Sequence, residues 1–140
     1  MQIVPLKKEH LDKINAQGAQ DYVSTWITSD MKKELAAGNS FSVIDGGEVL
    51  GCGGIVEFWK ERACVWAILS GNCGSRFVVI HRAVAGFLSL QDYRRLEATA
   101  DVNFGAGQRW LEMLGFRLET PVMKHYLPNG ADAAMYVRGV

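Results

Sequence analysis

The sequence predicts an α/β protein with a mixed sheet that carries helices on both faces. Segments with strand-like alternation are interleaved with segments whose apolar residues recur at helical spacing, in the order β-α-α-β-β-β-α-β-α-β-β. Residues Ala63–Leu69 are almost wholly apolar, as in a strand that is covered on both faces. A glycine-rich turn, Ser70–Arg76, joins this strand to an amphipathic helix. These three observations fix the predicted fold class.

The N-terminal region begins with a short strand, Gln2–Leu6, and a helix from Lys7 to about Asn15. Residues Ala16–Gly18 break this helix. From Gln20 to Leu35 the apolar residues again recur at helical spacing. The pattern allows one helix or two before Gly38 ends the segment.

Three strands follow in the middle of the chain. Apolar and polar residues alternate over Ser40–Asp45, and Asp45–Glu48 is typical of a hairpin turn. The next strand, Val49–Phe58, contains three glycines, which indicate a bulge or a close approach of another backbone. The charged turn Lys60–Arg62 then leads into the apolar strand Ala63–Leu69.

The C-terminal half continues with alternating helices and strands and ends in a second hairpin. Its predicted elements are a helix with Phe77, Ile80, Val84 and Leu88 on its apolar face, a strand over Tyr93–Val102, a helix containing Trp110, Leu111 and Leu114, a strand that begins at Phe116–Glu119, and segments 122–127 and 133–137 that flank the turn Pro128–Gly130. The glycines Gly105 and Gly107 weaken the start of the last helix, which indicates close approach to a neighbour or a ligand.

The composition of the chain argues against several classes of function. With 140 residues, the chain has the size of one domain, and we expect a single domain over residues 1–140. The 15 Lys and Arg residues balance the 15 Asp and Glu residues, which argues against a broad nucleic-acid surface. The three cysteines do not have zinc-like spacing, so we expect no metal site. Without a signal peptide or a bilayer-length apolar run, we expect a cytoplasmic protein with no membrane partner.

The turn Ser70–Arg76 is the first candidate binding site. A glycine turn at the start of a helix can direct several backbone N–H groups at one anion, at the positive end of the helix dipole. We therefore expect a phosphate-bearing ligand at this turn. Cys73 lies in the same loop near the helix start, where it is either a small loop residue or a reactive thiol.

A second motif lies around the last predicted helix: Asn103-x-x-Ala106-x-x-x-Trp110, which ends in Leu114-Gly115-Phe116. This motif and the order of elements resemble the GNAT family of N-acetyltransferases. Family members commonly have Asn-x-x-Ala-x-x-x-Tyr ending in Leu-Gly-Phe, and the tyrosine often acts as general acid to the departing thiolate. Trp110 stands in its place, and an indole N–H is too weak an acid for that role.

The resemblance also covers the glycine turn. The coenzyme A loop of the family has the pattern Gln/Arg-x-x-Gly-x-Gly/Ala, and alignment on Gly74 puts Gly71 and Arg76 where its first and last residues are expected. Arg76 either obstructs the backbone approach or supplies a charge to the pyrophosphate. The resemblance implies acetyl-coenzyme A as cofactor, bound by Ile68, Leu69, Ser70, Asn72, Cys73, Gly74, Ser75, Arg76, Asn103, Ala106 and Trp110. It also implies that the strands ending at Leu69 and beginning at Tyr93 are parallel neighbours that diverge.

Acetyl transfer to an amine requires a base, and the central strand contains no carboxylate between Ala63 and Ser70. Glu57, near the end of the preceding strand, is the best candidate base, followed by Glu97 and Asp101. For each of these, a solvated charge at a strand end is the simpler interpretation. Ser70 is a candidate to hydrogen-bond the leaving sulfur or a bound water, and is otherwise a turn serine.

Two functions follow as hypotheses. The first is an acetyl-coenzyme A-dependent N-acetyltransferase whose acceptor is an amine on a small molecule or a protein. The second is a catalytically degenerate GNAT-fold structural or interaction protein of phage or prophage origin, with virion proteins as partners and the virion as location. It rests on Gly71, Arg76 and Trp110, and on a narrower resemblance to small GNAT-like phage proteins of the internal virion protein A type. That resemblance lies in Trp66–Gly71, Arg109–Gly115, and Asn129-Gly130 followed by a final strand.

Overall fold

The computed structural model describes residues 1–139, which form two compact units. The first unit contains Met1–Val56 and Trp66–Gln91, and the second contains Glu57–Val65 and the chain from Asp92 onward. Each unit is described by itself below. Within the described residues, every helix is too short or too polar to cross a membrane.

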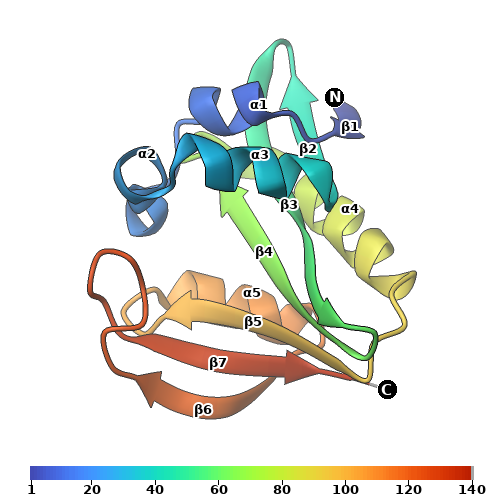
Figure 1. The fold of residues 1–140 in the computed structure, drawn as a ribbon. Helices are drawn as coiled ribbons and strands as arrows, with labels where there is room; N and C mark the ends of the chain where they lie inside the picture. Colours follow the sequence, from blue (N-terminus) through green and yellow to red (C-terminus); the bar gives the residue numbers. More distant parts are fainter. Residues whose placement is uncertain (140) are drawn as a thin grey trace. The chain divides into compact units, whose positions relative to one another are not determined.

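The order of helices and strands agrees with the sequence prediction (Figure 1). The elements are β1 (Gln2–Pro5), α1 (Lys8–Lys13), the short 3-10 helix η1 (Gly18–Gln20), α2 (Tyr22–Trp26), α3 (Ser29–Ala37), β2 (Asn39–Asp45), β3 (Glu48–Trp59), β4 (Arg62–Leu69), the short 3-10 helix η2 (Gly74–Arg76), α4 (Phe77–Ser89), β5 (Arg95–Asp101), α5 (Gly105–Met113), β6 (Arg117–Met123) and β7 (Ala133–Arg138). The segment that the sequence left as one helix or two therefore contains two, α2 and α3. They are separated at Ile27, whose backbone is extended, and the Thr28 side chain caps α3.

The strands pair in the order β1-β2-β3-β4-β5-β7-β6. Strands β4 and β5 are parallel neighbours, with Arg62 opposite Arg95 and Cys64 opposite Glu97. The prediction of parallel, adjacent central strands is thus confirmed. The remaining described pairs, β1–β2, β2–β3, β5–β7 and β6–β7, are antiparallel. The sheet is therefore mixed, as predicted.

Two predicted strand boundaries are wrong. Strand β5 begins at Arg95 and not at Tyr93, because the first ladder hydrogen bond is donated by the Arg95 amide to the Glu61 carbonyl. The separate strand predicted over residues 122–127 does not form. One irregular strand, β6, ends at Met123 instead, and the Asp132 carboxylate then accepts a hydrogen bond from the His125 amide, which fixes a loop there. A hydrogen bond from the backbone to the Asp132 side chain thus takes the place of the strand pairing predicted for residues 122–127.

Helices pack on both faces of β3 in the first unit. A side chain at Gly51 would contact Ile80 of α4, whereas Cys52 belongs to an apolar cluster with Leu11 of α1 and Val23 of α2. Successive residues of a strand point to opposite faces, so α4 and α1 cover different faces of β3. This confirms the predicted layering for the first unit.

The glycines of β3 mark close backbone approaches, as predicted. A Cβ atom at Gly54 would lie 2.6 Å from the Asn39 carbonyl oxygen, and one at Gly53 would lie 3.1 Å from the Trp66 carbonyl oxygen. A side chain at Gly54 would therefore collide with β2, and one at Gly53 would press against β4.

A partly buried chain of hydrogen bonds anchors α1 to β2 and β3. The Lys7 amide donates to His10 Nδ1 at 3.1 Å, so this nitrogen is an acceptor and the Ser42 hydroxyl, at 2.8 Å, donates to it. Ser42 Oγ then accepts from Cys52 Sγ at 3.5 Å. Partial burial lowers the pKa of His10, and the charge of Lys7 acts in the same direction; burial raises the pKa of Cys52 to about 11.

This arrangement predicts a loss of stability in mild acid. The folded state favours neutral His10, so the unfolded chain takes up the proton first as the pH falls below about 6.5, the ordinary pKa of histidine. The free energy of unfolding should decrease from that pH down to the lower folded pKa. His10→Asn keeps an acceptor near the Nδ1 position but does not titrate. Urea unfolding at pH 7 and 5.5 should therefore show a smaller loss for the variant, and equal losses would contradict the assignment.

Candidate functional site

The two edges of β4 in the first unit have different hydrogen-bond partners. The Ser70 amide donates to the Leu50 carbonyl of β3 at 2.8 Å. Because backbone groups alternate direction along a strand, the N–H and C=O of Leu69 point to the opposite edge. We call this the outer edge of β4. It consists of the Ala67 carbonyl, both backbone groups of Leu69, and the Gly71 amide.

Residues 15–20 occupy the outer edge of β4. The Gln17 amide donates to the Leu69 carbonyl at 2.9 Å, and the Gly71 amide donates to the Asn15 carbonyl at 3.0 Å. These two bonds flank an antiparallel bridge between Ala16 and Ser70. The edge is thus paired with the chain's own N-terminal region.

The Gln20 side chain completes this pairing. Its Nε2 donates to the Ala67 carbonyl at 2.6 Å, and its Oε1 accepts from the Leu69 amide at 3.0 Å. Gln17 Nε2 donates to the same Oε1 at 2.9 Å and so holds the carboxamide in place. Neither glutamine is predicted as a site residue from the sequence, because side-chain pairing with a strand edge leaves no periodic signal.

Hydrogen bonds of two buried side chains, Ser70 and Cys73, hold the loop after β4 in place. The Ser70 hydroxyl, which is buried, accepts from the Asn72 amide at 3.1 Å. The Cys73 thiol is also buried and donates to the carbonyls of Ser70 and Leu50. Burial raises the pKa of Cys73. These contacts favour the interpretation of Cys73 as a small structural loop residue over that of a reactive thiol.

The start of η2 carries backbone N–H groups suited to an anion. Gly74 has φ +53°, and open space surrounds the position of its absent Cβ. Within residues 1–139, the amides of Cys73, Gly74 and Ser75 have no hydrogen-bond partner. The next two amides bond within the turn, since those of Arg76 and Phe77 donate to Cys73 and Gly74. Three consecutive amides are thus available where η2 leads into α4.

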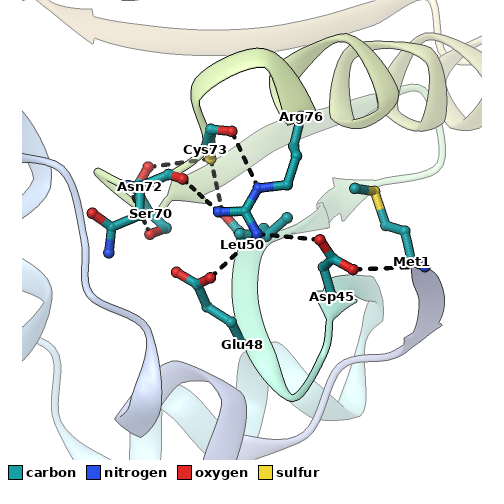
Figure 2. Close-up of polar contacts among 8 residues, drawn as sticks. All are labelled: Met1, Asp45, Glu48, Leu50, Ser70, Asn72, Cys73 and Arg76. Carbon is teal, nitrogen blue, oxygen red and sulfur yellow. Dashed lines mark hydrogen bonds and ion pairs between the residues drawn. The ribbon is translucent and has the colours of Figure 1, made fainter.

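Figure 2 shows Arg76 between this loop and the β2–β3 hairpin. Its Nη1 lies 3.2 Å from the Asp45 carboxylate and 3.3 Å from that of Glu48. Its Nη2 donates to the Asn72 carbonyl at 2.6 Å, and its Nε donates to the Cys73 carbonyl. Whether Arg76 obstructs a ligand or supplies a charge to it stays a prediction from the sequence. Arg76 joins the loop to the hairpin.

The candidate bases lie in the second unit, and they differ in accessibility. Glu57 is exposed and accepts a hydrogen bond from the Tyr93 hydroxyl at 2.7 Å, which raises the pKa of Tyr93. Glu97 is buried and bonds to both Arg62 and Arg95. The Arg62 guanidinium is the main cause of its lowered pKa. A carboxylate held between two guanidinium groups is a poor proton acceptor, so Glu57 is the better candidate.

The second sequence motif forms the start of α5. Asn103 is exposed, and its amide donates to the Asp101 carboxylate in a turn before the helix. Ala106 is also exposed, whereas Trp110 is half-buried. A Cβ atom at Gly107 would lie 2.7 Å from the Phe104 ring, so the predicted close approach is made by that ring.

Gln108 was missed by the sequence analysis. Its side chain donates to the Val102 carbonyl at 3.1 Å and accepts from the Tyr136 hydroxyl at the same distance, which joins α5 to the end of β5 and to the middle of β7. A glutamine inside a helix gives no sequence signal for such a role.

The predicted site residues divide between the two units. Ile68, Leu69, Ser70, Asn72, Cys73, Gly74, Ser75 and Arg76 lie together in the first unit, and Glu57, Asn103, Ala106 and Trp110 lie in the second. The described residues include no group of three or more His, Cys, Asp or Glu side chains that can hold a metal ion.

Comparison with solved structures identifies the fold. The chain superimposes on Ard1 from Thermoplasma volcanium with a TM-score of 0.79 at 16% identity, covering 99% of this chain and 97% of that one. It superimposes on an N-acetyltransferase from Staphylococcus aureus with a TM-score of 0.74 at 12% identity, covering 99% of this chain and 96% of that one. For a GNAT-family acetyltransferase from Bacillus anthracis, the TM-score is 0.64 at 14% identity, with 98% of this chain and 93% of that one covered. No protein-family model and no curated protein sequence matches the chain. The chain thus has the fold of GNAT acetyltransferases.

The backbone of Gly74 yields a stability prediction. Gly74→Ala should lower the free energy of unfolding by about 1 kcal/mol, because a left-handed backbone is unfavourable for a residue with a Cβ. A steric clash adds no further loss of stability, since no atom lies within 4 Å of the Cβ position. Gly74→Asn should cost less, because asparagine adopts this conformation more readily. Chemical denaturation of both variants checks the order, and equal losses would contradict it.

The contacts of Arg76 predict that it supports the fold. Arg76→Ala should lower the melting temperature, because it leaves the Asp45 and Glu48 carboxylates without their shared cation and removes bonds to two loop carbonyls. The loss should shrink in 1 M salt, which screens the remaining repulsion. Arg82→Ala, at an exposed arginine of α4, is the control and should change little. A salt-independent loss would argue against the ionic part of this explanation.

Proposed function

We propose that this protein binds acetyl-coenzyme A and transfers its acetyl group to an amine. The observation that carries the proposal is the set of three unpartnered amides at Cys73, Gly74 and Ser75, which directly precede a helix in a GNAT fold. Such amides suit the pyrophosphate of the cofactor. The open space around Gly74 lets an anion approach the backbone.

The transfer forms one bond and breaks another. The amine nitrogen attacks the thioester carbonyl carbon, the carbon–sulfur bond breaks, the amine loses a proton, and the thiolate receives one. In the proposal, Glu57 is the base that takes the amine proton, because its carboxylate is exposed and is not paired with a cation in the described structure. Ser70 hydrogen-bonds the leaving sulfur or a bound water. Trp110 is expected to pack against the cofactor and not to donate a proton. The acceptor is an amine on a small molecule or a protein.

A second candidate function is supported by a different observation. The outer edge of β4 is paired with residues 15–20, and Arg76 is held by carboxylates. Both features suit a GNAT fold that is kept as a structural or interaction module without catalysis. A phage or prophage origin, with virion proteins as partners, remains a prediction from the sequence. This candidate predicts no acetyl transfer to any amine of a broad panel, and thiol release at ordinary enzyme rates would exclude it.

Calorimetric titration with acetyl-coenzyme A tests the leading proposal. The wild type should bind with a dissociation constant between about 1 µM and 1 mM, and Gly74→Asp should weaken binding at least tenfold through like-charge repulsion with the pyrophosphate. Gly74→Asn is the matched control, since it has nearly the same size and backbone preference but no charge. It should bind much more tightly than Gly74→Asp. No heat and no thermal shift for the wild type at millimolar ligand would overturn the proposal.

A further inference from the structure

Residues 15–20 satisfy three backbone groups of β4 and one amide just after it, all of which would otherwise be open to a ligand. These groups are the Ala67 carbonyl, the Leu69 amide and carbonyl, and the Gly71 amide. We propose that this segment is an internal competitor, which must leave the outer edge of β4 before an extended, amide-bearing ligand can bind there. The proposal rests on the proposed function, in which that ligand is acetyl-coenzyme A.

The competition follows from matching chemistry. The Gln20 carboxamide offers one N–H donor and one oxygen acceptor to groups on the same edge of the strand, as the backbone N–H and C=O of one residue in a neighbouring strand do. The arm of coenzyme A contains two amide groups with the same donors and acceptors. A strand edge can pair with only one extended partner at a time, so Gln20 and such a ligand exclude each other.

The segment is held by few contacts, so its release does not require unfolding of the unit. Its backbone pairing with β4 is a single bridge at Ala16, and none of residues 15–20 is fully buried. Gly18 has no neighbouring atom within 4 Å of its Cβ position. Ala16 does pack against the apolar cluster, which makes the closed position the preferred one. Segments with so little burial open at low free-energy cost.

Two variants weaken the segment without changing β4. Gln20→Ala removes the carboxamide that bonds to Ala67 and Leu69. Gln17→Pro removes the amide that donates to the Leu69 carbonyl. Proline fits here because Gln17 has φ −59° and the preceding Ala16 pairs as a strand residue does. Gln2→Ala, at an exposed glutamine of β1, is the matched control.

Hydrogen exchange followed by NMR measures opening in the absence of any ligand. In Gln20→Ala, the Leu69 amide should exchange at least about tenfold faster than in the wild type. The adjacent Ser70 amide, which bonds to β3, should keep its protection and serves as an internal control. Unchanged exchange of Leu69 in both variants would overturn the proposal, because the segment would then not protect the edge.

Titration of full-length wild type and variants with acetyl-coenzyme A tests competition. Gln20→Ala and Gln17→Pro should each bind about tenfold more tightly than the wild type, the change expected for one or two net hydrogen bonds, and Gln2→Ala should match the wild type. Equal affinities throughout would overturn the competition and leave the proposed function intact. If no protein binds although Leu69 exchanges faster, the proposed function fails, and the competition fails with it because there is no ligand for residues 15–20 to exclude.

Discussion

The backbone donors and acceptors of β4 need hydrogen-bond partners, and this requirement determines the path of the chain in the first unit. The register between β4 and β5 joins Arg62–Cys64 to Arg95–Glu97, and β4 continues to Leu69. Buried backbone donors and acceptors without partners are costly, and an exposed strand edge invites pairing with another chain. Residues 15–20 supply partners for the outer edge of β4, through one backbone bridge and one glutamine side chain. The path of the chain between α1 and α2 depends on this requirement.

Two sets of groups near the loop that follows β4 act in opposite directions on a bound anion. Three amides at Cys73–Ser75 favour a negative group. The nearby carboxylates of Asp45 and Glu48 disfavour it, and both already share the Arg76 guanidinium. The Arg76 guanidinium thus bonds to the hairpin carboxylates and to the loop. A ligand at this loop depends on backbone amides more than on a side-chain cation.

In the second unit, ionic contacts decide which carboxylates remain accessible. Arg95 bonds to Glu119 through two nitrogen–oxygen pairs, each of 2.7 Å, and also to Glu97. Arg62 bonds to Glu97 from the neighbouring strand and lies over the rings of Phe58 and Trp59. This network places charged groups where parallel strands β4 and β5 begin to pair, and it keeps Glu97 ionised. Glu57 lies outside the network, which is why it is left as the candidate base.

The sequence by itself determined the order of elements and the central strand–loop–helix unit. Apolar runs such as Ala63–Leu69, and glycines at Gly53 and Gly74, reflect local requirements of burial, close approach and backbone conformation, so they can be recognised from neighbouring residues. Strand ends were less predictable: Tyr93 lies before β5 because ladder bonds, and not residue type, define where pairing starts. The candidate loop was likewise found from its glycines.

Only the tertiary structure decided what the polar side chains do. Arg76 bonds to carboxylates about 30 residues earlier in the chain, and Gln20 bonds to a strand almost 50 residues later. Glu97 and Glu57 have the same side chain, but one lies between two arginines and the other is exposed. Hydrogen bonds between residues far apart in the chain leave no spacing or periodicity in a single sequence, because their partners are chosen by folding.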